Sequence, residues 1–122
     1  MMKFSETHEW IDVSGKIGTV GVTHFAQKEL GDIVYVELPK VGKQVKAGEQ
    51  AAVLESTKAA ADVYSPVSGV ILGVNETLTS ASELVNQAPE TKGWLFKIEL
   101  SNPRELDTLL DEKNYRSKSS SS

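Results

Sequence analysis

The 122-residue sequence contains no cysteine, which excludes disulfide bonds, thiolate metal sites and thiol nucleophiles. It has only two histidines, His8 and His24, and these lack the i, i+4 spacing of a zinc site on a helix. We therefore expect both histidines to be surface residues or locally hydrogen-bonded, and we expect no metal site. No Gly-x-Ser-x-Gly elbow or phosphate-loop glycine pattern occurs, so the sequence gives no support to a conventional enzyme with catalytic residues of its own.

Basic charge and long hydrophobic runs are also scarce. The formal net charge is −4 and no cluster of lysine and arginine interrupts it, which argues against nucleic-acid binding. The longest apolar runs fall far below the roughly 18 residues that span a bilayer. The first residues show neither a signal-peptide core nor an Arg- and Ser-rich presequence. We expect a cytoplasmic protein of bacterial type that binds neither nucleic acid nor membrane.

Short strand-like runs separated by glycine or proline dominate the chain. They cover residues 10–13, 17–22, 33–38, 50–56, 60–64, 70–74 and 94–100. In the last run Trp94, Phe96, Ile98 and Leu100 alternate with polar residues and share one face. Strands this short and frequent predict a mainly β protein, a small sandwich or flattened barrel of antiparallel strands.

Three short helices are predicted around this sheet. Thr23 caps a helix that runs to Leu30 and ends at Gly31. A capping-box pattern over residues 80–83 precedes a second helix, and an Asn-Pro pair at 102–103 starts a third, with a leucine stripe at 106, 109 and 110. The length predicts a single domain over residues 1–115, and the Ser-rich tail at 116–122 is expected to be disordered.

Lys58 is the residue whose setting indicates a specific role. It lies between two strand-like runs, in Ser56-Thr57-Lys58-Ala59, which predicts the tip of a tight hairpin. The small neighbours leave its amine open, while Glu55 and Asp62 on either side can orient a partner electrostatically. A lysine held away from the protein body suits a tethered carrier, which keeps its cargo at high effective concentration. A lone surface lysine is more often only a solvated charge, so these features do not identify a cargo.

The segment Glu55-Ser56-Thr57-Lys58-Ala59 resembles the Glu-Ser-x-Lys-Ala motif of lipoyl-lysine proteins. From Thr7 to about Tyr115 the chain resembles the glycine cleavage system H-protein family. The matching blocks include His8-Glu9-Trp10, Val36-Glu37-Leu38-Pro39, the run from Ala59 to Gly69, and Gly93-Trp94-Leu95-Phe96-Lys97-Ile98. The ordered series is far more specific than the lysine motif alone.

This resemblance implies a single lipoyl-carrier domain with a lipoyl-domain-like barrel-sandwich fold, including a short helix near its C-terminus. It implies that Lys58 carries covalent lipoate, and that the protein is a monomeric carrier rather than an enzyme. The implied partners are a pyridoxal-phosphate glycine decarboxylase (P protein), a tetrahydrofolate-dependent aminomethyltransferase (T protein), dihydrolipoyl dehydrogenase (L protein), and a lipoate ligase or a lipoyl or octanoyl transferase. The lipoyl-lysine would accept an aminomethyl group from the first, deliver it to the second and be re-oxidised by the third.

Two acidic residues are further candidates. By spacing alone Glu6 and Glu9 form a solvent-facing pair. The resemblance instead makes Glu9 and Asp62 candidate contacts for the amine of the carried group, in a cleft that excludes water. Two residues nearby differ from those of relatives. Thr57 replaces a common valine. Glu29, on the helix predicted to end at Leu30, replaces a histidine found in some members, so the resemblance implies no histidine contact at that position.

Three other interpretations remain open. A lipoyl domain of a 2-oxoacid dehydrogenase would place a similar lysine on a hairpin, but would lack the His-Glu-Trp block. A biotin carrier would carry methionine on both sides of the lysine, whereas Thr57 and Ala59 stand there. An H-like protein that relays lipoate to 2-oxoacid dehydrogenases, or regulates them, would use the same lysine without glycine cleavage.

Overall fold

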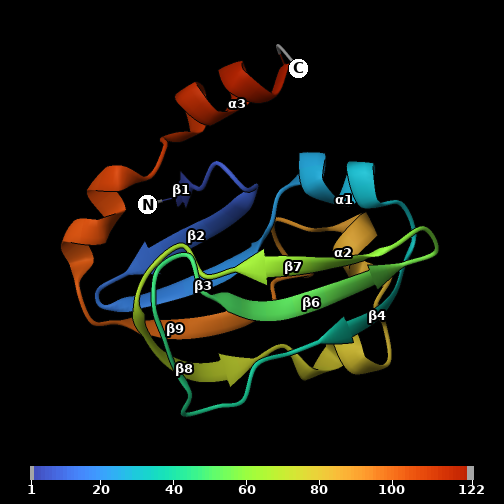
Figure 1. Cartoon of the computed structure of the whole chain (residues 1–122), viewed down its shortest axis with the longest axis horizontal. Coiled ribbons are helices and arrows are strands. Elements are labelled where there is room, and N and C mark those ends of the chain that lie inside the picture. Colours follow the sequence, from blue (N-terminus) through green and yellow to red (C-terminus); the bar gives the residue numbers. More distant parts are fainter. Residues whose placement is uncertain (1, 121–122) are drawn as a thin grey trace.

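Alternating short strands form two antiparallel sheets in the computed structural model, which describes residues 2–120 (Figure 1). The larger sheet has the strand order β1-β2-β3-β9-β8-β5 and the smaller one has the order β4-β6-β7. The strands are β1 Met2–Phe4, β2 Glu9–Ser14, β3 Ile17–Val22, β4 Ile33–Glu37, β5 Gln44–Val45, β6 Gln50–Ser56, β7 Ala60–Tyr64, β8 Gly69–Val74 and β9 Phe96–Leu100. This is the predicted mainly β architecture, with the sheets packed as a barrel-like sandwich.

The hydrophobic core lies between the two sheets and takes residues from both. Val20, Ile71 and Ile98 of the larger sheet belong to the same buried cluster as Leu54 and Val63 of the smaller sheet. In β9 the residues at 96, 98 and 100 are buried and those at 97 and 99 are exposed, as the sequence pattern predicts. Trp94, predicted to begin this strand, precedes it.

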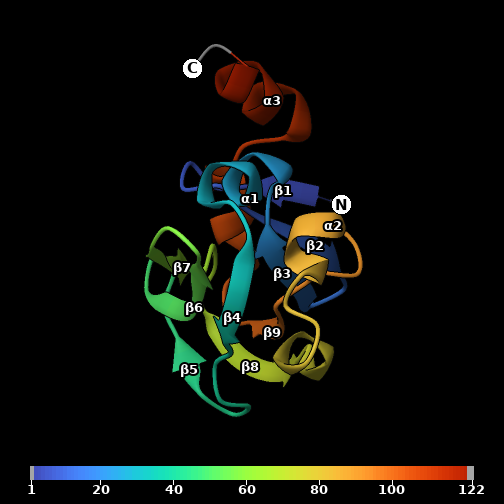
Figure 2. The same ribbon diagram turned by 90° about the vertical axis from the view of Figure 1, so that its right-hand side faces the viewer.

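Short helices close the ends of the sandwich (Figure 2). The α-helices are α1 His24–Leu30, α2 Leu84–Gln87 and α3 Glu112–Ser120, and the 3₁₀ helices are η1 Glu76–Thr79 and η2 Pro103–Thr108. The side chain of Thr23 accepts a hydrogen bond from the Ala26 N–H, and Gly31 ends α1 with φ of 83°, so the predicted start and stop signals of this helix are confirmed.

Two helical predictions need correction. Ser80 does not cap α2: Glu83 stands at the N-cap position without a side-chain cap, and α2 is a single turn. Asn102 does cap the segment that follows it, but the cap opens a 3₁₀ helix. A capping-box pattern satisfies only the first amide groups of a helix. After Asn102 the leucine stripe does not extend the helix, because Leu109 has an extended backbone and Leu110 pairs with Phe4 in a β-bridge.

The C-terminal segment also differs from the prediction of an unstructured tail. Helix α3 continues from Glu112 through Arg116 to Ser120, while residues 121 and 122 lie outside the described residues. Tyr115 is buried against Phe4 and Trp10 in a second, smaller hydrophobic cluster, and its ring stacks on Phe4 with centroids 4.7 Å apart. Serine-rich composition predicts disorder only where no side chain anchors the segment, and here Tyr115 and Arg116 provide anchors.

Candidate functional site

The β6–β7 hairpin places Lys58 at an exposed tip that extends past α1 (Figure 1). Ser56 organises the turn. Its backbone N–H donates to the Ala59 carbonyl at 2.8 Å, and its hydroxyl oxygen accepts from the N–H groups of Lys58 and Ala59 at 3.1 Å each. Thr57 N–H donates to the carbonyl of Asp32 at 3.1 Å. The tip is therefore a defined turn that is tied to the α1–β4 loop.

The α1–β4 loop is itself fixed by Asn86 from α2. The Asn86 amide donates to the Gly31 carbonyl at 2.8 Å, and its oxygen accepts from Ile33 N–H at 2.9 Å. The side chain of Lys58 lies over this loop, because a Cβ atom added at Gly31 would stand 3.3 Å from Lys58 Cε. The tip therefore rests on a loop that the side chain of Asn86 holds in place.

The remaining motif residues lie along the two arms of the hairpin. Glu55 pairs with Ala60 and Asp62 pairs with Val53 across the arms. Both acidic side chains are exposed, and the alternation along the strands puts them on the solvent face. The predicted placement of Glu55 and Asp62 near the tip agrees with this register.

A cavity of about 200 Å³ lies between the hairpin and α1. Its lining is largely apolar, with a few polar groups: Thr7, His8, Glu9, Val22, Phe25, Ala26, Glu29, Leu30, Leu54, Ala61, Asp62 and Val63. Leu30 and Glu29 belong to the last turn of α1, the helix whose end contacts Lys58. An apolar arm attached to Lys58 could fold back along this helix into the cavity.

Glu9 supplies a buried carboxylate to this cavity and is only 2% exposed. One of its oxygens accepts hydrogen bonds from the hydroxyls of Ser5 and Thr7, and the other accepts from Tyr64 N–H at 3.2 Å. Burial raises the pKa of Glu9, and the three hydrogen bonds only partly oppose that rise. The interpretation of Glu9 as half of a solvent-facing pair is therefore wrong, because β2 turns its side chain inward while Glu6 remains exposed.

His8 forms another part of the wall and has a left-handed backbone with φ of 73°. Its Nδ1 lies 2.7 Å from the hydroxyl of Tyr115, and its ring packs against Phe25 at a centroid distance of 4.5 Å. Burial lowers the pKa of His8, while the charge of Glu29 opposes this. The other histidine, His24, contacts the side chain of Gln27 at 3.1 Å. His24 is thus locally hydrogen-bonded, as expected, whereas the partner of His8 is distant in sequence.

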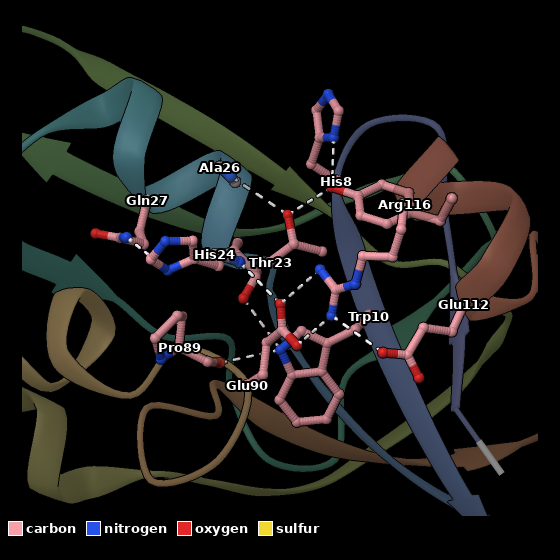
Figure 3. Close-up of polar contacts among 12 residues, drawn as sticks. His8, Trp10, Thr23, His24, Ala26, Gln27, Pro89, Glu90, Glu112 and Arg116 are labelled. Atoms are coloured by element: carbon pink, nitrogen blue, oxygen red, sulfur yellow. Dashed lines mark hydrogen bonds and ion pairs between the residues drawn. The ribbon is translucent and has the colours of Figure 1, made fainter. Parts of the chain in front are cut away.

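An ion pair holds α3 beside α1 (Figure 3). Arg116 donates to both carboxylate oxygens of Glu90, at 2.7 and 3.2 Å, and Glu90 also accepts from His24 N–H at 2.9 Å. Burial alone would raise the pKa of Glu90, but these hydrogen bonds and the charge of Arg116 outweigh it and lower that pKa. The C-terminal helix is therefore fastened next to the N-terminal end of α1.

The structure brings together Glu9 and Asp62, which sequence reasoning singled out, and places the Lys58 hairpin beside them. Sequence reasoning missed the hydroxyl ligands of Glu9, the contact of His8 with Tyr115, and the role of Asn86. The Ser-x-Thr-x-Glu spacing from Ser5 to Glu9 was the only local signal for any of these. Among residues 2–120 no three His, Asp or Glu side chains are grouped closely enough to hold a metal ion, and no helix is long and apolar enough to cross a membrane.

Comparison with known proteins gives a consistent match over nearly the whole chain. The family model described as glycine cleavage H-protein matches residues 2–122. The glycine cleavage system H protein of Thermotoga maritima is 55% identical over 116 residues, which cover 95% of this chain and 94% of that protein. The corresponding protein of Symbiobacterium thermophilum is 54% identical over 114 residues, covering 93% and 89%. The crystal structure of a glycine cleavage system H protein from Mycobacterium marinum superposes with a TM-score of 0.89 at 32% identity, covering 98% of this chain and 96% of that one.

Proposed function

Because the chain belongs to the glycine cleavage H-protein family, we propose that it is a single lipoyl-carrier domain whose covalent lipoate is attached at Lys58. The observation that carries the assignment of the lysine is the ordered hairpin tip, which exposes Lys58 on a turn held by Ser56. Glu55, Thr57 and Ala59 complete the surface that a lipoate ligase or a lipoyl or octanoyl transferase would recognise.

The residues around the hairpin fit such a group. Amide formation would remove the charge of Lys58, and an uncharged arm can leave water at low cost for an apolar cavity. Leu30, Leu54 and Val63 provide apolar walls within reach of the hairpin. When bound, lipoate would supply a reactive disulfide that takes up and releases the aminomethyl group.

The polar residues of the cavity then have separate tasks. Glu9 and Asp62 would bind the cationic amine of the aminomethyl group, Glu9 from the buried end and Asp62 from the exposed rim. Ser5 and Thr7 hold the Glu9 carboxylate in place through their hydroxyls. The apolar walls exclude water from a group that water would otherwise hydrolyse. The chain therefore shelters and presents its cargo, and other proteins carry out the reactions.

The partners follow from this role. A pyridoxal-phosphate glycine decarboxylase (P protein) would load the aminomethyl group, a tetrahydrofolate-dependent aminomethyltransferase (T protein) would unload it, and dihydrolipoyl dehydrogenase (L protein) would restore the disulfide. Each partner must reach the hairpin tip, where Glu55 and Asp62 offer negative charge for orientation. An active site on the carrier itself is not required.

The attachment is tested by peptide mass spectrometry on protein isolated from its own host. One lipoyl mass on Lys58 and loss of tryptic cleavage after it are expected. Lys58→Arg keeps the charge but cannot be lipoylated, so it should abolish glycine-dependent aminomethyl transfer, while Lys28→Arg on the exposed face of α1 should retain it. Unmodified Lys58 in cells with active lipoate ligase would contradict the proposal. Lipoylation with no aminomethyl transfer would instead favour a relay to 2-oxoacid dehydrogenases.

A further inference from the structure

Tyr115 links the C-terminal helix to two parts of the carrier cavity at once. Its side chain is only 1% exposed, and its hydroxyl lies 2.7 Å from Nδ1 of His8 and 2.6 Å from the hydroxyl of Thr23. His8 lines the cavity, and Thr23 is the N-cap of α1, the helix that forms one cavity wall. Figure 3 shows His8, Thr23 and Ala26 along this chain of hydrogen bonds.

The direction of these hydrogen bonds follows from the need to satisfy every buried proton. Thr23 is fully buried, and its hydroxyl oxygen already accepts from Ala26 N–H at 3.3 Å. Among residues 2–120 the only atom that can accept the proton of the Thr23 hydroxyl is the hydroxyl oxygen of Tyr115. The Thr23 hydroxyl therefore donates to Tyr115. Tyr115 then donates its own proton to Nδ1 of His8.

A nitrogen that accepts a hydrogen bond carries no proton, so the remaining proton of a neutral His8 lies on Nε2. We propose that Tyr115 is a positioning residue that holds His8 as the neutral Nε2–H tautomer in the wall of the carrier cavity. The opposite direction would require Nδ1–H of His8 to donate to Tyr115 and Tyr115 to donate to Thr23. The buried proton of Thr23 would then have no acceptor, at the cost of an unsatisfied group.

The same series of hydrogen bonds opposes protonation of His8. A histidinium would have to donate from Nδ1, which would reverse the direction of both hydrogen bonds of Tyr115 and leave the Thr23 proton without an acceptor. This matters for the cavity, whose charged groups are the carboxylates of Glu9, Glu29 and Asp62. A cation at His8 would compete with a bound amine for these carboxylates, whereas a neutral ring leaves them available. This step rests on the proposed function, in which the carried group is a cationic amine.

The contacts of α3 make Tyr115 a rigid anchor for this task. The ring of Tyr115 stacks on Phe4, and the neighbouring Arg116 is paired with Glu90. These two contacts fix α3 and so fix the position of the Tyr115 hydroxyl. Tyr115→Phe removes the hydroxyl while keeping the ring that stacks on Phe4. Tyr35→Phe is the matched control, because Tyr35 is exposed on β4, and its hydroxyl has no recorded partner among the described residues.

The test is long-range proton–nitrogen NMR of the histidine rings in the unlipoylated protein, at a mildly alkaline pH where histidine is neutral. Wild type and Tyr35→Phe should show His8 with an unprotonated Nδ1 and a proton on Nε2. In Tyr115→Phe the Nδ1 signal of His8 should shift toward the position of a protonated nitrogen, while His24 stays unchanged as the internal reference. A protonated Nδ1 in wild type, or an unchanged His8 in Tyr115→Phe, overturns the proposal. The wild-type spectrum decides even if the variant does not fold.

A second measurement follows the loaded carrier. After loading with glycine and the decarboxylase, without the aminomethyltransferase, Tyr115→Phe should lose its aminomethyl group roughly three- to tenfold faster than Tyr35→Phe. Equal rates would restrict Tyr115 to stabilising the fold and overturn its positioning role. If neither variant can be loaded, the proposed function fails while the tautomer result stands, so the two failures are distinguishable.

Discussion

The aliphatic part of the Lys58 side chain lies across Gly31, the residue that ends α1. A Cβ atom at Gly31 would stand 3.3 Å from Lys58 Cε, and the backbone of Gly31 has φ of 83° and ψ of −157°, a region that only glycine occupies readily. The lysine proposed as the attachment site therefore lies against the end of α1.

The first prediction concerns Gly31→Ala. The variant should lose about 1–3 kcal/mol of stability, because alanine must adopt a strained backbone conformation at this position. Lipoylation at saturating ligase should remain complete, because the flexible Lys58 side chain can move away from the added methyl group. Chemical denaturation gives the stability. Gly73→Ala is the control, since a Cβ atom at Gly73 has no neighbour within 4 Å, and it should change stability far less. Equal stability of the two variants would show that the backbone at Gly31 is not strained.

The second prediction concerns Ser56→Ala at the hairpin tip. The substitution leaves the N–H groups of Lys58 and Ala59 without their acceptor and should cost about 1 kcal/mol. A less ordered tip should also be a poorer substrate, so the initial rate of lipoylation by one purified ligase should fall several-fold. Thr57→Val keeps the shape of a side chain that makes no recorded hydrogen bond within residues 2–120, and its rate should stay near wild type. A larger effect at Thr57 would mean that the ligase reads the side chain and that the order of the turn matters little.

The Lys58 hairpin could be predicted from sequence because all its determinants are local. The runs at 50–56 and 60–64 match β6 and β7 in full, and only the three turn residues 57–59 separate them. Helix α1 was equally predictable, since Thr23 and Gly31 act on the helix that directly adjoins them. In both cases the pattern and the contacts it specifies lie within a few residues of each other.

The environment of Glu9 and the position of α3 could not be predicted in this way. Tyr64 N–H reaches Glu9 across 55 residues, and Tyr115 reaches His8 across 107. Such contacts depend on how the sheets and helices pack, and periodicity along the chain carries no signal for them. The short edge strands β1 and β5 were also missed, because two or three residues are too few to show alternation.

The third prediction concerns the acid stability conferred by Glu90. Its pKa is lowered in the folded protein, because the hydrogen bonds and charge of Arg116 outweigh burial. The ionised carboxylate therefore contributes stability above its unfolded pKa near 4.5, and this contribution is lost as the pH falls through the lower folded value. Glu90→Gln should be about 1 kcal/mol less stable at neutral pH, and the difference should shrink in acid.

Urea denaturation at several pH values measures this difference. Glu6→Gln is the control, because Glu6 contacts Lys118 at 3.4 Å with both side chains largely exposed, and it should change stability little at any pH. A gap between wild type and Glu90→Gln that stays constant down to strongly acidic pH would exclude ionisation of Glu90 as its origin.

The last prediction concerns Glu9, whose pKa is raised by burial in the folded protein. Because the folded state then binds the proton more tightly than the unfolded state, the protonated form favours folding. As the pH rises from the unfolded value of 4.5 through the raised folded value, wild type should lose stability relative to Glu9→Gln, which does not titrate. The amide can still accept from Ser5 and Thr7 but sets its NH₂ group against Tyr64 N–H, which adds an offset that does not depend on pH.

The slope of the stability difference against pH therefore isolates the ionisation of Glu9, and a flat difference between pH 4 and 8 would falsify the raised pKa.

The same variant separates stability from function. The neutral amide introduced by this substitution cannot pair with a cationic amine, so glycine-loaded Glu9→Gln should release its aminomethyl group at least roughly tenfold faster than wild type. Asp62→Asn, at the exposed rim, should show a smaller effect, because water screens its charge. If Glu9→Gln gained stability at neutral pH while losing retention of the aminomethyl group, the buried carboxylate would be kept at a cost to folding because the cargo requires it.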